Sequence, residues 1–441
     1  MGAVAELRQP DTSAFVIVND DARCERLRLI EELRTVVDRQ QQRRSGGETW
    51  SVTFSPDNSC FAWSCGHRTI TLIPWHPYKN RPSAALALSR PELYARDPRT
   101  PVIINCGDFV WSMAFGISKS DHRDGQSARC RHYFNFSSAT GQTMVLAVGL
   151  NNGRIKVYTL TGKLITELMD HKDVVRDLKF SPDGKLILLS ASRDSTLKLW
   201  DLKDDGNLFK TLRHSDNEWV MSCVWSHDSK WAASGGSGKE VYVWRAGTWI
   251  LHRKLSAHLH NVASCQFSPD GAFLASCSFD TSVILWDYVN GQIVTIIWHT
   301  DPPPRPIFAS GDNEHFVRYV SFSPDCEHFT TVCDDGNIRI WSIYNSHSPV
   351  CTTRVQNALC SAYSSDGYCL AVGTREGAAH LFAAPMTVRS LVSICRSVIR
   401  RNVSLDGIGG LPVPEPVKAF LAYKDVFSSG RRRSLSYSGE N

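Results

Sequence analysis

Two segments of the chain carry a histidine, a serine, an aspartate and a tryptophan in the same order and at nearly the same spacing. The two sets are His171, Ser190, Asp194 and Trp200, and His258, Ser276, Asp280 and Trp286. Serine, histidine and aspartate supply the nucleophile, the base and the orienting carboxylate of a serine hydrolase when they converge in space. Whether the two sets are catalytic or structural therefore depends on the secondary-structure elements that carry these residues.

Those elements belong to a sequence repeat. Residues Val174 to Trp200 fall into three short apolar runs, separated by Ser-Pro-Asp-Gly and by Ser-Arg-Asp-Ser. Proline presets the backbone angle, glycine accepts a positive φ and aspartate accepts hydrogen bonds from neighbouring N–H groups, so both separators are turn signals. The runs are therefore predicted to be strands of an antiparallel meander. The same pattern returns at Trp219–Trp244, Val262–Trp286 and Val317–Trp341.

The number of repeats can be obtained from the aromatic residue at the end of each unit. Seven residues occupy this position: Trp75, Tyr158, Trp200, Trp244, Trp286, Trp341 and Phe382. From Tyr158 onward their spacing is 41 to 44 residues, with one interval of 55. A period of this length, with a Trp-Asp close and an upstream histidine, resembles the WD40 repeat. The resemblance implies an all-β fold, a seven-bladed propeller over residues 49–384 with four strands in each blade.

The same resemblance assigns a structural role to the two four-residue sets. In WD40 repeats the histidine, serine, aspartate and tryptophan tie the loop before one strand to the turn between two others. We favour this role over hydrolysis. Other blades depart from the pattern, with Asn152 and Tyr158 in blade two, Gly238 in blade four, and Glu376 with Phe382 in blade seven. These blades are expected to be less tightly tied.

Composition sets the broad class of the protein. The 441 residues are 42% hydrophobic and 21% charged, which is typical of a globular protein, and the formal net charge of +5 is too small to indicate nucleic acid binding. The sequence has no apolar run long enough for membrane insertion and no signal peptide, so an intracellular location, in the cytoplasm or also in the nucleus, is expected. The 14 cysteines are scattered singly without a CxxC pair, so we expect neither a structural metal nor a cofactor.

Four segments lie outside the regular repeat. Residues 1–48 contain an apolar pattern between Arg26 and Val37 that suits either a helix or the strand that closes the ring, and we favour the strand. Insertions are expected at 76–106, with one strand near Val102 to Asn105, at 116–142, and at 300–315, where Pro-Pro-Pro favours a stiff spacer over a docking motif. The tail, 425–441, is expected to be disordered.

One face of the propeller is predicted to bind a target. In WD40 folds, the residue before the turn aspartate and residues near the start of the first strand face the open end of the ring. These positions give a basic surface with apolar anchors, residue types that are common in interface hot spots. Its members are Trp50, Arg68, Trp111, Arg176, Arg193, Met221, Phe279, Arg318 and Arg375. We expect an acidic or phosphorylated protein segment as the ligand, unless these arginines are solvated or pair with local carboxylates.

After Phe382 the repeat stops and an amphipathic pattern begins. Residues 390–401 place five side chains on one helical face with arginines opposite: Leu391, Ile394, Cys395, Val398 and Ile399. Residues 407–410 interrupt this pattern. A proline-fixed segment and a second short helix follow over 411–421, with Leu411, Pro412, Val413, Pro414, Val417, Phe420 and Leu421. A segment of about 35 residues with this much apolar surface cannot form a stable core alone. We therefore expect it to bind another polypeptide; the alternative is a cap on blade seven.

These two motifs, in this order, resemble the SOCS box. Ser-Leu-x-x-x-Cys-x-x-x-Ile matches its elongin-binding motif, and Leu-Pro-x-Pro followed by Val-x-x-Phe-Leu matches its cullin motif. Residues 385–424 are accordingly identified as a SOCS box, and residues 48–424 as similar to the WD-repeat and SOCS-box-containing proteins. The resemblance implies that the first helix binds elongin C, and elongin B with it, and that the second motif binds cullin-5 with a RING subunit.

The implied function is that of a non-catalytic substrate receptor in a ubiquitin ligase. The propeller would hold the target and the box would recruit the transfer machinery, so the chain would supply proximity rather than catalytic residues. The alternative is a WD40 scaffold that assembles signalling proteins without ubiquitin transfer. A hydrolase that uses the central channel is the weakest hypothesis, because the sequence offers no further convergent acid–base or metal set.

Overall fold

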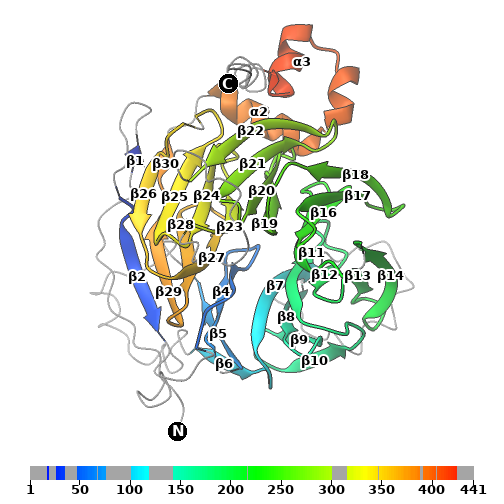
Figure 1. Cartoon of the computed structure of the whole chain (residues 1–441), viewed down its shortest axis with the longest axis vertical. Helices are drawn as coiled ribbons and strands as arrows, with labels where there is room; N and C mark the ends of the chain where they lie inside the picture. The colour runs from blue at the N-terminus through cyan, green and yellow to red at the C-terminus, as the bar shows by residue number, and fades with distance from the viewer. Residues whose placement is uncertain are drawn as a thin grey trace, which may run out of the picture.

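The chain forms a ring of β-sheets with helices attached at one side, as the computed structural model in Figure 1 shows. The structure describes residues 17–18, 26–34, 47–66, 68–75, 101–118, 143–215, 217–299, 315–345, 347–387, 391–403 and 405–424. Within these residues, seven four-stranded sheets surround a common centre. The seven-bladed propeller predicted from the repeat is therefore confirmed.

Six blades are built from four consecutive antiparallel strands each. Blade one contains β3 (Val52–Phe54), β4 (Cys60–Ser64), β5 (Thr69–Pro74) and β6 (Val102–Asn105). Blade two contains β7 (Val110–Ser118), β8 (Thr143–Leu150), β9 (Ile155–Thr159) and β10 (Leu164–Leu168). Blade three contains β11 (Val175–Phe180), β12 (Ile187–Ser192), β13 (Thr196–Asp201) and β14 (Asn207–Arg213). Blade four contains β15 (Val220–Trp225), β16 (Trp231–Gly236), β17 (Glu240–Arg245) and β18 (Ile250–Ser256). Blade five contains β19 (Val262–Phe267), β20 (Leu274–Ser278), β21 (Ser282–Asp287) and β22 (Gln292–Trp298). Blade six contains β23 (Val317–Phe322), β24 (His328–Cys333), β25 (Asn337–Ser342) and β26 (Cys351–Arg354).

Blade seven joins the two ends of the propeller. Its strands β27 (Ala358–Tyr363), β28 (Cys369–Thr374) and β29 (Ala378–Ala383) are completed by β2 (Leu29–Arg34), which pairs antiparallel with β29. The segment that the sequence allowed as strand or helix is thus a strand. Leu33 packs between blades seven and one, and Leu27 packs between blades six and seven. A short parallel pair, β1 (Ile17–Val18) with β30 (Met386–Thr387), lies beyond this sheet.

Turn chemistry fixes each meander. In blade three, the Ser181 hydroxyl donates to the Asp183 carboxylate at 2.8 Å, the same carboxylate accepts from the Lys185 backbone N–H at 3.1 Å, and Gly184 has a φ of 80°. Ser268, Asp270 and Gly271 repeat this arrangement in blade five. The Ser-Pro-Asp-Gly phrase is therefore a hydrogen-bonded turn at the same place in both blades.

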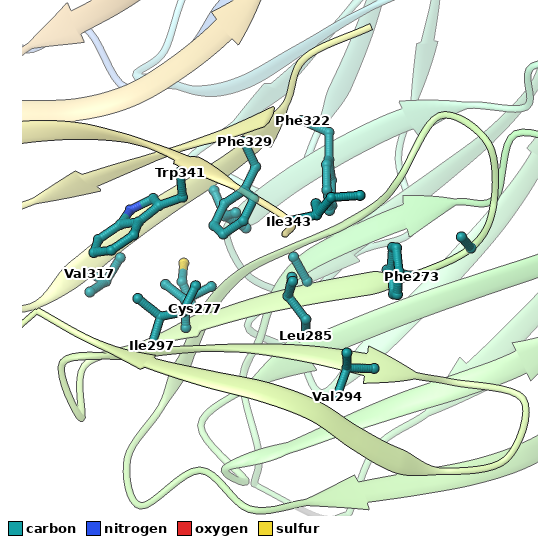
Figure 2. Close-up of a cluster of buried hydrophobic side chains, with 14 of the residues drawn as sticks. Phe273, Cys277, Leu285, Val294, Ile297, Val317, Phe322, Phe329, Trp341 and Ile343 are labelled. Carbon is teal, nitrogen blue, oxygen red and sulfur yellow. The ribbon is translucent and has the colours of Figure 1, made fainter. Parts of the chain in front are cut away.

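The core lies between blades rather than within one sheet. Figure 2 shows the layer between blades five and six, where Phe322, Phe329 and Trp341 of blade six face Leu285 and Ile297 of blade five. Middle strands such as β12 and β20 are buried on both faces, whereas the outermost strands β14 and β18 expose most of their residues. Because each large ring fills the space against the next blade, the period of closing aromatics in the sequence reflects this packing.

The insertions fall largely outside the described residues. The expected strand in the first insertion is β6, the outer strand of blade one. In blade two, β7 continues to Ser118, so the interruption between β7 and β8 begins later than the expected residue 116. The polyproline stretch and the tail 425–441 lie outside the described residues.

Two helices and a 3-10 turn follow blade seven. They are α2 (Leu391–Asn402), the 3-10 helix Leu405–Gly410 and α3 (Glu415–Leu421). Figure 1 shows them together beside blade five. None of the helices in the described part of the chain has the length and apolar character that crossing a membrane requires.

Candidate protein-interaction sites

The two histidine–serine–aspartate sets form closed hydrogen-bond chains. In blade three, the Trp200 indole N–H donates to the Ser190 hydroxyl at 2.9 Å, this hydroxyl lies 2.7 Å from His171 Nε2, and His171 Nδ1 lies 2.8 Å from Asp194. Asp194 also accepts from the Lys172 backbone N–H at 3.0 Å. The four side chains thus tie the loop before β11 to the turn between β12 and β13.

Burial makes these chains structural. Ser190 and Ser276 are fully buried, so no substrate carbonyl could reach either hydroxyl. In blade five, Ser276 accepts from Trp286 and bonds to His258, both at 2.7 Å. Burial favours the neutral form of Asp194, but the interaction with His171 and the hydrogen bonds from Thr196 and the Lys172 backbone together outweigh burial and hold the pKa of Asp194 well below its usual value. The arrangement is a buried brace within each blade.

Two further blades carry partial versions that the sequence analysis missed. In blade four, His214 Nε2 lies 2.7 Å from the Ser234 hydroxyl, which accepts from Trp244 at 3.2 Å. In blade six, Thr331 takes the place of serine: its hydroxyl lies 2.8 Å from His299 Nε2 and accepts from Trp341 at 2.9 Å. Blade four is therefore better tied than Gly238 suggested. In both blades the sequence signal for the brace is the histidine upstream of the closing tryptophan. In blade six this residue, His299, precedes the long insertion.

The predicted target face surrounds one end of the central channel. A cavity of about 550 Å³ is lined by six of its nine members: Trp50, Trp111, Arg176, Met221, Phe279 and Arg318. Arg193 lies next to this group, with its guanidinium carbon 5.8 Å from the Trp111 ring centroid. Arg68 and Arg375 are exposed and are not among the residues that line the cavity.

Aromatic rings hold the arginines at this end of the channel. The guanidinium carbon of Arg176 lies 4.1 Å from the Trp111 ring centroid and 5.7 Å from that of Trp50, and the two tryptophan rings are 4.7 Å apart. Arg193 lies 4.7 Å from the ring of Trp219, which is exposed and which the sequence analysis did not assign to the face. The position of Trp219 in the sequence, immediately before β15, the first strand of blade four, could have assigned it to the face.

The C-terminal box exposes its apolar face. Leu391 is 79% exposed, and the side chains that share its face are also exposed: Ile394, Cys395, Val398 and Ile399. In the second motif, Val417 is exposed, and Leu411, Pro412, Val413, Pro414 and Phe420 are exposed or partly so. Leu421 is buried, so it supports the packing of the box rather than its surface.

The arginine face of α2 is the buried one. Arg396 and Arg400 are each only 3% exposed. Arg400 donates to the backbone carbonyl of Gly271 at 3.1 Å, and Arg401 donates to that of Pro324 at 2.9 Å. Gly271 belongs to the β19–β20 turn and Pro324 to the β23–β24 turn. The box is thus docked on blades five and six through its cationic side.

Aromatic contacts complete this attachment. The Arg396 guanidinium carbon lies 3.5 Å from the Phe420 ring centroid and 4.3 Å from that of Tyr423. Tyr423 is buried, packs edge-on against Phe273 of blade five and donates its hydroxyl to Asp270 at 2.6 Å. Burial and the adjacent Asp270 carboxylate raise the pKa of Tyr423, so it remains a neutral donor. These contacts fix α2 and α3 relative to the propeller while the apolar face of α2 stays open.

Comparisons with known proteins match both parts of the chain. The family described as "WD domain, G-beta repeat" matches residues 162–201, 206–245, 249–287 and 307–342, and the family "SOCS box" matches residues 387–422. Blades one and seven and the first three strands of blade two fall outside the WD matches, yet these blades have the same four strands. Human WD repeat and SOCS box-containing protein 1 is 45% identical over 399 residues, which cover 87% of this chain and 93% of that protein. The protein of the same name from Xenopus tropicalis is 43% identical over 429 residues, covering 93% and 99%.

Proposed function

Because this chain belongs to the family of WD repeat and SOCS box-containing proteins, we propose that it is the substrate-recognition subunit of a ubiquitin ligase built on elongin B, elongin C, cullin-5 and a RING subunit. The propeller holds the target protein, and the box recruits the ligase. The chain itself performs no bond chemistry. Its contribution is to bring a lysine of the target close to the transfer machinery and to keep it there.

The exposed apolar face of α2 is the observation that carries this proposal. An amphipathic helix normally buries its apolar stripe against its own domain. Here Arg396 and Arg400 attach the helix to blades five and six, while Leu391 and its neighbours are left for another chain. This is the helix-in-groove mode of recognition, with an elongin C pocket as the groove and Leu391 as the anchor. Cys395 is small enough to allow close approach.

A pull-down of the full chain tests the recruitment. Losing a buried leucine anchor costs roughly 2–4 kcal/mol, or about thirtyfold or more in affinity. Leu391→Ala combined with Cys395→Phe is therefore expected to lose elongins B and C together with cullin-5. Ile250→Ala, which truncates an exposed aliphatic residue on the outer strand β18, should keep all of them.

A second pair of chains separates the receptor from a plain scaffold. A receptor truncated at Pro385 should lose elongins and cullin-5 but keep its target, which should then accumulate in cells. Leu411→Ala with Pro412→Ala should lose cullin-5 and keep the elongins. Retention of elongin C by the Leu391 and Cys395 double variant would rule out the anchor, and a wild-type chain that captures neither elongin would leave the scaffold as the function.

A further inference from the structure

Two arginines at the mouth of the channel are held by tryptophans. The Arg176 and Arg193 guanidinium carbons lie 4.1 Å and 5.8 Å from the centroid of the same ring, that of Trp111. Trp50 lies against Arg176 and Trp219 against Arg193. Stacking leaves the N–H groups around the edge of a guanidinium available, because the contact uses only its face. The pair is therefore positioned before any ligand arrives.

Neither guanidinium is neutralised by the protein. Among the described residues, Arg176 and Arg193 make no ion pair and no side-chain hydrogen bond. Other arginines of the propeller form ion pairs: Arg318 pairs with Asp334, and Arg339 pairs with Asp335. Of the five arginines assigned to the predicted face, only Arg318 forms an ion pair within the described residues. Arg176 and Arg193 are the unpaired members that lie against tryptophan rings.

The carboxylate nearest in sequence is already engaged. Asp177 accepts from the Ser222 hydroxyl at 3.1 Å and from the Cys223 backbone N–H at 3.0 Å, and Lys179 lies 3.5 Å from it. Burial, then the charges of Arg193 and Arg318, lower the pKa of Arg176 to about 10. An anion bound beside Arg176 would offset the repulsion from Arg193 and Arg318 and would replace the hydration that the buried guanidinium has lost.

We propose that Arg176 and Arg193 bind a phosphorylated serine or threonine side chain of the target protein. A phosphomonoester carries about −1.5 to −2 charges and three acceptor oxygens, which match two unpaired guanidiniums, whereas one carboxylate would neutralise only one. Trp50, Trp219 and Met221 supply apolar surface for the residues on either side of the phosphate. The inference rests on the proposed function, since it names what the target-binding face recognises.

Peptide libraries test the ligand class without knowledge of the target. Three immobilised libraries would present degenerate sequences around a fixed phosphoserine, serine or glutamate, and the full-length chain would be passed over each. We expect retention by the phosphoserine library alone, followed by an affinity measurement on the enriched peptides by fluorescence anisotropy. Arg176→Gln and Arg193→Gln should each weaken binding about tenfold or more, because each removes charge-assisted hydrogen bonds.

Matched variants keep the result interpretable. Arg154→Gln, at an arginine that pairs with Glu167 on the outer part of blade two, should bind like the wild type. Arg193→Lys keeps the charge but loses the fork, so it should fold normally and still bind more weakly. Equal retention by the serine library, no retention by any library, or undiminished binding by the Arg176→Gln, Arg193→Gln double variant would overturn the proposal. Equal retention by the glutamate library would also overturn it and would make an unmodified acidic segment the ligand.

The same preparations separate this proposal from the ligase function. The Leu391→Ala, Cys395→Phe variant should lose the elongins and keep the phosphopeptide. Failure of elongin binding in the wild type would refute the ligase role and leave the peptide result intact. Loss of phosphopeptide recognition with normal elongin capture would refute only the ligand class.

Discussion

The buried His214 of blade four and the partly buried His299 of blade six each bond to a hydroxyl that also accepts from a tryptophan. His214 is stacked 3.9 Å from the Tyr242 ring, and His299 packs edge-on against Trp341. Burial lowers the pKa of both imidazoles from 6.5 to about 3. Both are therefore neutral in the folded protein at every physiological pH.

This neutrality makes stability depend on pH. Between pH 6.5 and about 3 the unfolded chain binds a proton at each histidine and the folded chain does not, so the free energy of unfolding falls as the pH falls through this window. Between pH 7.5 and 5.5 the loss should be about 1.4 kcal/mol for each histidine. Urea denaturation of His214→Gln should show a loss smaller by that amount, because glutamine does not titrate.

A double variant checks this prediction. His214→Gln combined with His299→Gln should reduce the loss by about twice that amount, because the pKa of His299 is lowered in the same way. A His214→Gln chain with the full wild-type loss at pH 5.5 would show that His214 is not the titrating group. Carboxylates do not interfere, since their pKa values lie below the range measured.

At the residue scale, the sequence could predict the complete sets but not the partial ones. His171 and His258 stand at nearly equal distances before Trp200 and Trp286, so their pattern is readable. Gly238 replaces the aspartate in blade four, and an insertion separates His299 from its blade in sequence although not in space. Whether Arg176 would find a carboxylate was also open, because that depends on which side chains of different blades meet at the channel.

At the element scale, α2 is attached by the side that would ordinarily face water. The guanidiniums of Arg396 and Arg400 reach backbone carbonyls and aromatic rings, so their charges are hydrogen-bonded although the side chains are buried. The last turn of α2 contains Arg400 and Arg401, where cations also interact favourably with the helix dipole. The attachment therefore combines charge, stacking and hydrogen bonds.

Arg400→Ala should loosen α2 without altering its apolar face. The substitution removes the hydrogen bonds to Gly271 and Val403, and bonds from charged donors are worth about 1.5–3 kcal/mol each. Hydrogen–deuterium exchange of residues 391–403 should become at least about tenfold faster in the variant, while elongin capture persists. Arg401→Ala removes one bond from an exposed side chain and should have a smaller effect. Unchanged exchange in the Arg400 variant would contradict the assigned attachment.

The spacing of apolar residues predicted the helix but not its orientation. Leu391, Ile394 and Val398 share one face in the sequence pattern, and this face is exposed in the structure. The turns that receive the arginines lie in blades five and six, far from α2 in sequence, and nothing in residues 390–401 identifies them. A cap on blade seven was the expected alternative, and the contacts of Arg400 and Arg401 are with blades five and six instead.

At the scale of the whole molecule, the ring depends on one strand from the N-terminal segment. Without β2, the strand β29 would present an unpaired edge, which is a template for pairing with other chains. The apolar side chains of Leu27 and Leu33 would also leave the two cores that flank blade seven. The closure is therefore both a hydrogen-bonded seam and a packed one.

Removal of residues 1–46 should open this seam. We expect a thermal midpoint several degrees lower, together with oligomers detectable by size-exclusion chromatography with light scattering. A chain that lacks only residues 1–16 keeps β1 and β2 and should behave as the full chain does. A monomeric product with an unchanged midpoint after the longer deletion would show that the ring closes without β2.

The number of blades could be predicted because each closing aromatic repeats at a regular interval. The closing strand could not be settled in the same way. Leu-Ile-Glu-Glu-Leu-Arg has apolar residues at positions that suit both a helix and a half-buried strand, and only pairing with β29 decides between them. Tertiary contact over more than 300 residues overrides the local ambiguity.

That seam also sets the order of events during protein synthesis. Arg34 and its partner Ala378 are 344 residues apart along the chain, as their positions in the register give. At about 5–20 residues per second, the ribosome needs roughly 17–70 s to make the second strand after the first has emerged. Throughout this interval the nascent ring has a free edge, so a holdase chaperone has its longest opportunity here. The SOCS box is translated only after the pairing partner of β2, and a polypeptide stalled before Ala378 would lack both the closed ring and the signal for ligase recruitment.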